Sequence, residues 1–279
     1  MPDAPWIAVR ARLGVADPFA RAALADAFFA AGAQGLHEDG ARLVTHFPPG
    51  TDMDAVRAQL EAAHAGVEIE TGEPPIDWSE AWKDALDAHT LGSLTVTPPW
   101  LADRYDPARR IVIEPGMAFG TGEHGTTRGV IRLLEDVLRP GDVVADLGAG
   151  SAVLAIAAAR LGAARVFAIE LDPEAIPNAE ANVAQNDVAA QVHVFEGDAG
   201  ALLPLVAPVR VVLANIISSV LEQLLPVIAA SLTADGAAIL SGILREERPH
   251  LLAVLEAGGW QVTAEDEEDI WWSVAITRR

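Results

Sequence analysis

The feature that most constrains the fold of this chain is an apolar strand that runs directly into a glycine turn. Residues 143–151 read Val-Val-Ala-Asp-Leu-Gly-Ala-Gly-Ser, and Glu170 stands 22 residues after Gly148, at the end of a second apolar run. A strand, a tight turn, a helix and a second strand that ends on a carboxylate form the unit that holds a nucleoside in doubly wound sheets. We expect the backbone to approach the ligand at Gly148 and Gly150, and Glu170 to accept hydrogen bonds from ribose hydroxyls.

The turn also favours one kind of nucleoside. A nicotinamide-binding turn carries three glycines as G-x-G-x-x-G, whereas the run from Gly148 reads G-A-G-S-A-V. Asp146 lies inside the strand end, where dinucleotide-binding turns usually lack an acid. An acid, two glycines and a short helix resemble the turn of S-adenosylmethionine-dependent methyltransferases. The turn therefore indicates S-adenosylmethionine as the cofactor and disfavours a nicotinamide dehydrogenase.

Charge and composition narrow the range of partners. The 279 residues carry a formal charge of −21, which repels nucleic-acid phosphates, so we expect no direct binding to nucleic acid. The same charge either attracts a small basic protein or serves only to keep the protein in solution. No apolar run reaches the roughly 18–20 residues that span a bilayer, and the first residues lack the segments of a signal peptide. We therefore expect a cytoplasmic protein that does not enter a membrane. Without cysteine there is no zinc–thiolate site, and we expect no metal.

Residues 1–72 alternate strand and helix patterns in an order that predicts a small ferredoxin-like α+β domain. The order is β-α-β-β-α-β, with a hairpin signal at Asp39-Gly40. The expected strands cover residues 6–13, 35–38, 42–47 and 67–70, and the expected helices cover residues 17–31 and 52–64. No catalytic set is evident here, and we expect His37, His46 and His64 to be surface or packing residues. Residues 73–84, with two consecutive prolines, are predicted to be a linker.

Residues 85–279 predict a Rossmann-like α/β domain. Apolar strands are expected at residues 111–114, 143–147, 166–171, 192–196, 209–215 and 237–241, with helices between them, the first at residues 126–138. Continuous Val, Ile, Leu and Ala runs are typical of parallel strands buried on both faces. Two further strands, 260–264 and 271–277, are separated only by an acidic turn at residues 265–269, so they should be antiparallel. A parallel sheet that ends in an antiparallel C-terminal hairpin is the class I methyltransferase architecture.

Candidate site residues lie at the carboxyl ends of these strands, where ligands bind in such sheets. Asp198, in the run Glu-Gly-Asp, either bonds an adenine amino group or caps the next helix. Asn215 ends a long apolar run, where an amide is costly without a partner. Its carbonyl either accepts a hydrogen bond from an amine nucleophile or from the cofactor, or it caps a turn.

A glycine-rich loop precedes the first helix of this domain. Residues 114–128 read Glu-Pro-Gly-Met-Ala-Phe-Gly-Thr-Gly-Glu-His-Gly-Thr-Thr-Arg. The hydroxyls of Thr126 and Thr127 either cap the helix or contact the charged methionine end of the cofactor. His124 is either a proton acceptor or a structural loop residue.

Four of these motifs occur in the same order in the PrmA family, which the chain resembles over its whole length. They are residues 116–128, 146–151, 214–216 and 240–244. PrmA proteins are bacterial methyltransferases that modify large-subunit ribosomal protein eleven. The resemblance implies cofactor contacts at Thr127, Gly148, Glu170 and Asn215, methylation of several lysines and one N-terminal amine, and a substrate-recognition role for the first domain. Two positions depart from the family: Ala152 stands for a usual third glycine, and Glu170 for a commoner aspartate.

Two further interpretations stay open at this point. The chain could be an S-adenosylmethionine-dependent transferase that acts on another protein or on a small amine. It could also be a cofactor-binding interaction module that has lost catalysis, although the retained Asn215 and intact glycine loop argue against this. If the chain methylates a lysine amine, which has a pKa of about 10.4, that amine must lose its proton before attack. Asn215 is the residue expected to orient the neutral amine.

Overall fold

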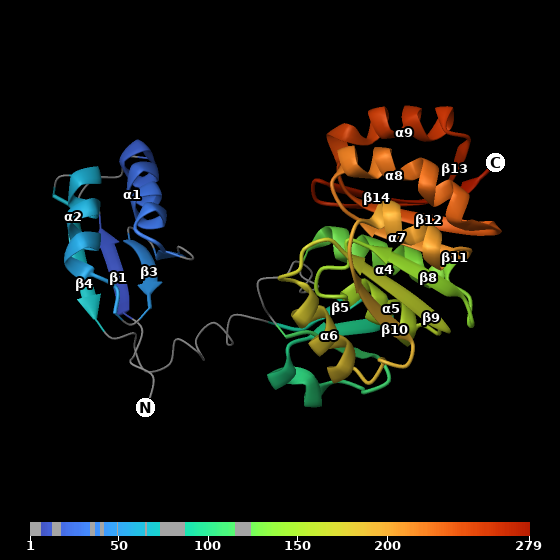
Figure 1. Ribbon diagram of the computed structural model, residues 1–279, viewed down its shortest axis with the longest axis horizontal. Helices are drawn as coiled ribbons and strands as arrows, with labels where there is room; N and C mark the ends of the chain where they lie inside the picture. The colour runs from blue at the N-terminus through green and yellow to red at the C-terminus, as the bar shows by residue number, and fades with distance from the viewer. Residues whose placement is uncertain are drawn as a thin grey trace. The chain divides into compact units, whose positions relative to one another are not determined.

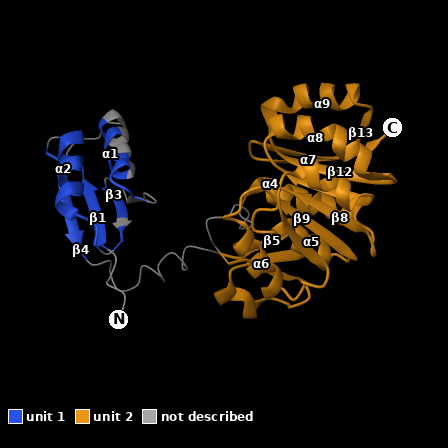
Figure 2. Cartoon of the chain, viewed as in Figure 1, with its two compact units in different colours: residues 1–86 blue, residues 87–279 orange. Residues whose placement is uncertain are grey.

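The computed structural model describes residues 7–12, 18–33, 37–39, 42–48, 50–64, 66–72, 87–114 and 124–279. Contacts between Cα atoms divide the chain into two compact units, Met1–Leu86 and Asp87–Arg279 (Figure 2). The predicted linker at residues 73–84 lies outside the described residues. No helix in the described ranges has both the length and the apolar character needed to cross a membrane.

The first unit is a four-stranded antiparallel sheet with two helices. Its strand order is β2-β3-β1-β4, and its elements follow the predicted β-α-β-β-α-β order. The bounds are β1 Ile7–Arg12, α1 Pro18–Ala30, β2 His37–Asp39, β3 Arg42–Phe47, α2 Met53–Ala63 and β4 Glu68–Gly72. Asp52 starts α2 by accepting hydrogen bonds from the N–H groups of Asp54 and Ala55, both at 3.1 Å. The core joins both helices to the sheet through Val9, Leu24, Phe28, Phe47, Val56 and Leu60.

The second unit is built on a seven-stranded sheet of order β10-β9-β8-β11-β12-β14-β13 (Figure 1). The first five of these strands run parallel to one another. Strand β14 pairs antiparallel with both β12 and β13, so it alone in this sheet runs in the opposite direction. The strand bounds are β8 Val143–Leu147, β9 Arg165–Glu170, β10 Val192–Glu196, β11 Val209–Asn215, β12 Leu232–Leu244, β13 Trp260–Glu268 and β14 Trp271–Arg278. The predicted Rossmann-like sheet with a C-terminal hairpin is therefore confirmed.

Helices cover both faces of this sheet, so its strands are buried on both sides. One apolar cluster packs α4, α5 and α6 against one face, and a second packs α7, α8 and α9 against the other. The helices are α4 Gly125–Val137, α5 Val153–Arg160, α6 Ile176–Gln185, α7 Ala199–Val206, α8 Ser218–Ser231 and α9 Arg248–Ala257, with a short 3₁₀ turn η2 at Arg245–Glu247. The chain order reverses between β8 and β11, which places the ligand-binding crevice there.

The strand expected at residues 111–114 does not join the large sheet. It is the three-residue β7, Arg110–Val112, in a separate three-stranded sheet with β5 His89–Leu91 and β6 Leu94–Thr97. The β5–β6 hairpin was not predicted, because each strand is short; Gly92 takes a positive φ of 61° in the turn between them. A 3₁₀ turn, η1 Pro99–Arg104, connects this hairpin to β7.

The predicted acidic turn at residues 265–269 is wrong. Strand β13 continues to Glu268, and only Asp269 and Ile270 lie between β13 and β14. Acidic residues disfavour a strand in isolation, but alternate side chains here meet arginines on opposite faces. Glu265 accepts from Arg248 at 2.7 Å, whereas Asp266 and Glu268 accept from Arg132. Compensated charge therefore lets the strand extend.

Candidate active site

A cavity of about 390 Å³ lies at the carboxyl ends of β8, β9 and β11, where the chain order reverses. It is lined by Thr127, Gly148, Ala149, Gly150, Val153, Leu154, Glu170, Asn215, Ile216, Ile217 and Val220. Five of the seven predicted site residues thus meet in one place, and only His124 and Asp198 are absent from the lining. A wider cleft of about 650 Å³, between η2 and the β13–β14 hairpin, contains none of the predicted residues.

The glycine turn forms one side of the cavity through an unusual backbone path. Gly148 has a φ of 72° and Gly150 a φ of 53°, both in the left-handed region. The N–H groups of Gly148 and Ala149 donate to the carbonyl of Ile169 at 2.8 and 3.1 Å, which ties the turn to the end of β9. A Cβ on Gly148 would lie 2.6 Å from Cγ2 of Ile216. Only glycine therefore leaves this close approach open.

Ala152, two residues after Gly150, also has a left-handed backbone conformation. Its φ is 64°, so an alanine here adopts the left-handed conformation that glycine takes without strain. The conformation costs an L-residue about 1–2 kcal/mol. Its N–H donates to the carbonyl of Ala149 at 2.8 Å, and its side chain is fully buried. The turn thus keeps its shape with a strained residue that neighbouring bonds hold in place.

Glu170 braces the turn as well as facing the cavity. Its Oε2 accepts from the N–H of Gly150 at 2.7 Å, and its Oε1 accepts from the N–H of Asp172 at 2.8 Å. A carboxylate has about four acceptor positions, so two remain for ribose hydroxyls. Glu170 therefore has acceptor positions available for the predicted hydrogen bonds from ribose hydroxyls.

Asp146, at the end of β8, is a fully buried carboxyl beneath the turn. The pKa of Asp146 is raised to about 7, chiefly by burial; the backbone N–H of Ala155 opposes this rise, and the nearby charge of Glu170 adds to it. The raised pKa means that the carboxyl holds a proton in mildly acidic solution. The sequence singled out this acid as a mark of the cofactor class, but gave no sign of its burial.

Thr127 brings a buried hydroxyl to the cavity from the first turn of α4. The residue is fully buried, and its Oγ1 has no hydrogen-bond partner among the described residues. A buried hydroxyl without a partner costs free energy unless a ligand supplies one. This orphaned group, together with the space kept free at Gly148, fits a bound S-adenosylmethionine.

Asn215 ends β11 in register with Ser241 of β12 and lines the cavity half-buried. The following residue, Ile216, donates its N–H to the carbonyl of Ser241 at 3.2 Å. Gly242 has a φ of 82°, and a Cβ there would lie 2.5 Å from the Ile216 carbonyl oxygen. The backbone after Asn215 is therefore pressed against β12, which fixes the direction of the strand end.

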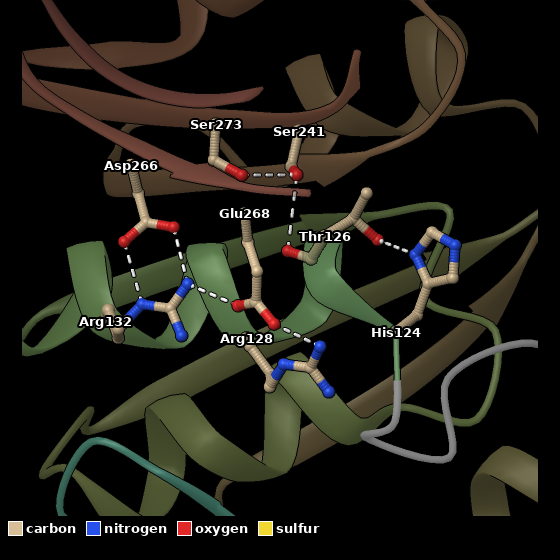
Figure 3. Close-up of polar contacts among 8 residues, drawn as sticks. All are labelled: His124, Thr126, Arg128, Arg132, Ser241, Asp266, Glu268 and Ser273. Atoms are coloured by element: carbon tan, nitrogen blue, oxygen red, sulfur yellow. Dashed lines mark hydrogen bonds and ion pairs between the residues drawn. The ribbon is translucent and has the colours of Figure 1, made fainter. Parts of the chain in front are cut away.

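His124 lies next to the cavity wall but outside its lining. Its Nδ1 pairs with the hydroxyl of Thr126 at 2.7 Å (Figure 3). Its backbone caps α4, and its ring centroid lies 4.8 Å from that of Trp271. Burial lowers the pKa of His124, and the charge of Arg128 lowers it further. Ser241 continues this group by donating to the Thr126 carbonyl at 3.2 Å. These contacts describe a structural position, and a catalytic role for His124 stays a prediction.

An ion-pair network supports α4 from the C-terminal hairpin. Arg132 donates to both carboxylate oxygens of Asp266 at 2.8 and 2.6 Å and to Glu268 at 2.7 Å, and Glu268 also pairs with Arg128 (Figure 3). The paired arginines hold the pKa of Glu268 below its usual range. The sequence did not reveal this network, because its partners lie more than 130 positions apart.

Asp198 caps a helix in this structure. Its Oδ1 accepts from the N–H of Ala201 at 2.9 Å at the start of α7. Of the two predicted roles, capping is the one observed, and adenine recognition stays a prediction.

Comparison with known proteins gives the chain its family. A family model described as ribosomal protein L11 methyltransferase (PrmA) matches residues 23–279. Ribosomal protein L11 methyltransferase from Thermus thermophilus is 36% identical over 251 residues, which cover 90% of this chain and 92% of that protein. The enzyme of that name from Pelotomaculum thermopropionicum is 41% identical over 226 residues, covering 80% of this chain and 73% of that protein.

A solved structure agrees. The ribosomal protein L11 methylase from Lactobacillus delbrueckii subsp. bulgaricus is 30% identical with a TM-score of 0.62, and the match covers 70% of this chain and 100% of that one. The resemblance seen in the motifs is thereby confirmed, and the chain belongs to the ribosomal protein L11 methyltransferase (PrmA) family.

Proposed function

We propose that this chain transfers methyl groups from S-adenosylmethionine to lysine and N-terminal amines of ribosomal protein L11. The observation that carries the proposal is the single cavity that joins the glycine turn, Glu170, Thr127 and Asn215 at the switch point of the sheet. When bound, S-adenosylmethionine supplies an electrophilic methyl group on a charged sulfur. The residues of the chain must then bind this cofactor, keep water away and align an amine.

The lining divides these tasks by chemistry. Gly148 and Gly150 leave backbone space for the cofactor, and Glu170 offers acceptors for the ribose hydroxyls. Thr127 offers a hydroxyl that has no hydrogen-bond partner among the described residues. Ile217 and Val220 form an apolar rim that is 65% and 38% exposed. An apolar rim of this kind excludes water when a substrate chain covers it.

Asn215 is the residue that we assign to the amine. Its side-chain carbonyl accepts a hydrogen bond from a neutral amine and so directs the nitrogen lone pair toward the methyl group. Among the described residues that line the cavity, Glu170 is the sole titratable side chain, and it already accepts hydrogen bonds from the turn. Water is therefore the proton acceptor that we favour, and amines of low pKa should react fastest near neutral pH.

Charge and the relatives' names support the protein substrate. The formal charge of −21 suits a basic partner, and the relatives are named for methylation of ribosomal protein L11. We place the reaction in the cytoplasm, where ribosomal proteins are assembled. The first unit is a fold of its own, separate from the unit that carries the cavity, and we assign it to substrate recognition.

Mass spectrometry of purified ribosomal protein L11 tests the proposal. After incubation with enzyme and S-adenosylmethionine, we expect methylated lysines and a methylated N-terminal amine. Unmodified protein L11 beside a methylated small amine or another methylated ribosomal protein would favour the alternative substrates. Binding of S-adenosylmethionine with no transfer to any ribosomal protein would favour a module without catalysis.

A truncation tests the assigned role of the first unit. A chain that begins at Asp87 should bind S-adenosylmethionine within about twofold of the full chain yet lose most methylation of ribosomal protein L11. Thermal melting must show that the truncated chain is folded. Efficient methylation by a folded truncation would remove the recognition role from the first unit.

A further inference from the structure

Helix α6 carries three asparagines one turn apart, Asn178, Asn182 and Asn186, and the last of them caps the helix. Asn182 and Asn186 are fully buried. A buried amide costs free energy unless its groups are paired, so the partners of these two side chains show what they do.

Both buried amides bind the strand segment that leads away from β7. Asn186 accepts from the N–H of Val112 at 2.8 Å and donates to its carbonyl at 2.6 Å, while Asn182 accepts from the N–H of Glu114 at 2.9 Å. Four helical residues rise about 6 Å, and two strand residues span about 6.6 Å. Successive asparagines on α6 therefore meet alternate strand residues, and α6 takes the place of a neighbouring strand.

Of the two buried asparagines, only Asn182 also bonds to the glycine turn. Its Nδ2 donates at 3.0 Å to the carbonyl of Ser151, which belongs to the glycine turn. This carbonyl begins the peptide unit of the strained Ala152, whose N–H donates to Ala149. The Ser151–Ala152 peptide is thus held at both ends, by Asn182 at the carbonyl and by Ala149 at the N–H. The Asn186 side chain makes no bond to the turn; its described partners are Val112 and the carbonyl of Asn182.

We propose that Asn182 is a positioning residue for the cofactor cavity. It holds the left-handed conformation at Ala152 and so keeps Gly150, two residues earlier, where Glu170 and the cofactor meet it. The inference rests on the proposed function, because it concerns the affinity of the same cavity for S-adenosylmethionine.

Two matched variants of the full chain separate positioning from plain structural support. Asn182→Ala and Asn186→Ala each remove a buried amide from the same helix and release the same strand segment, but only the first frees Ser151. Calorimetric titration with S-adenosylmethionine should show a Kd raised about tenfold in Asn182→Ala and changed less than about twofold in Asn186→Ala. In steady-state kinetics, Asn182→Ala should raise KM for S-adenosylmethionine and leave kcat at saturation within about twofold.

Two results with folded variants would overturn the inference while leaving the proposed function intact. One is a Kd for Asn182→Ala equal to that of the wild type, and the other is an equal rise in Kd in both variants. A wild-type chain that does not bind S-adenosylmethionine would overturn the proposed function itself. If Asn182→Ala does not fold, amide hydrogen exchange of the wild-type chain tests the inference instead. Addition of S-adenosylhomocysteine should slow exchange at the N–H of Glu114 severalfold and leave that of Val112 unchanged, and equal slowing at both would contradict the inference.

Discussion

The second unit holds its site with two regions that use different physical means. Around the glycine turn, the shape comes from the backbone: Gly148 and Gly150 take positive φ angles, and so does the buried Ala152. Around the C-terminal hairpin, the support comes from charged side chains, as Arg128 and Arg132 of α4 meet Asp266 and Glu268 of β13. In the first region a side chain at Gly148 would collide with Ile216, whereas the charged side chains of the second are partly exposed.

This difference predicts how each region responds to change. A backbone-shaped site fails when a side chain enters it, because positive φ and close approach leave no alternative arrangement. A network of partly exposed ion pairs shares its support among several residues, and such pairs contribute little individually. Substitutions near the turn should therefore have large effects on cofactor binding, and substitutions in the hairpin network should have small effects on stability.

The largest expected effect is that of Gly148→Val on cofactor binding. The new side chain would crowd Ile216 and force a β-branched residue to a φ of 72°, so calorimetry should detect no binding of S-adenosylmethionine. Gly141→Val is the matched control, since Gly141 has a φ of 90° but no heavy atom within 4 Å of an added Cβ. It should share the backbone strain and keep wild-type affinity. Near-normal affinity for S-adenosylmethionine in folded Gly148→Val would contradict the claim that the backbone shape of the turn controls cofactor binding.

Asp146 should show its effect in the pH dependence of stability. Its pKa is raised to about 7 in the folded chain, against about 3.9 when unfolded. Between these values the folded state holds a proton that the unfolded state has lost, so stability falls as pH rises from about 4 to about 7. Asp146→Asn cannot lose this proton, so its stability relative to wild type should rise over that range.

Denaturant unfolding without cofactor measures this difference. We expect Asp146→Asn to gain on the order of a few kcal/mol relative to wild type by pH 8, and to gain nothing near pH 4. Carboxylates with lowered pKa values, such as Glu268 and Glu265, act in both proteins and cancel in the comparison. A difference independent of pH would show that Asp146 is ionised throughout.

Asn215→Ala should lower methyl transfer at least tenfold while leaving the fold intact. Loss of one positioned polar contact costs about 1–3 kcal/mol in the transition state. The Kd for S-adenosylmethionine, measured on the same sample, serves as the internal control and should change much less than kcat. Full activity would move the amine-orienting role to another residue, and His124 would be the next to test.

The smallest effect is expected in the hairpin network. Arg132→Ala should lower the free energy of unfolding by about 1 kcal/mol, with cofactor affinity unchanged within about twofold, and high salt should shrink the difference. Arg139→Ala, which breaks a more exposed pair with Asp235, is the control and should cost less. A large loss of cofactor affinity in Arg132→Ala would show that the two regions are not independent.

The sequence predicted those parts of the fold that local pattern determines. The bounds of β8, β10 and β11 match the prediction because each is a run of mostly apolar residues with a clear end, such as Gly148 after β8 or Asn215 at the end of β11. The extent of β13 could not be predicted, because its last four residues are all acidic and form a strand only when distant arginines compensate them. The hairpin β5–β6 was missed because each strand has too few residues for a period to show.

The residues of the candidate site likewise fall into those that local sequence pattern could predict and those that it could not. Gly148, Gly150, Glu170 and Asn215 could be found because ends of parallel strands meet at one edge, and Thr127 was found chiefly through the family motif. Asp146 as a buried acid and Asn182 as a link between segments depend on contacts between distant parts of the chain. The four-residue spacing of Asn178, Asn182 and Asn186 places them on one helix face, but it does not identify the distant groups to which they bond.

The most direct test of the whole account is a crystal structure of the chain with S-adenosylhomocysteine bound. We predict that the ligand occupies the cavity of Gly148, Glu170 and Asn215, with ribose hydroxyls on the Glu170 carboxylate, the hydroxyl of Thr127 paired, and the sulfur facing Asn215. A ligand bound elsewhere, for example in the cleft between η2 and the β13–β14 hairpin, or a ribose without contact to Glu170, would contradict it.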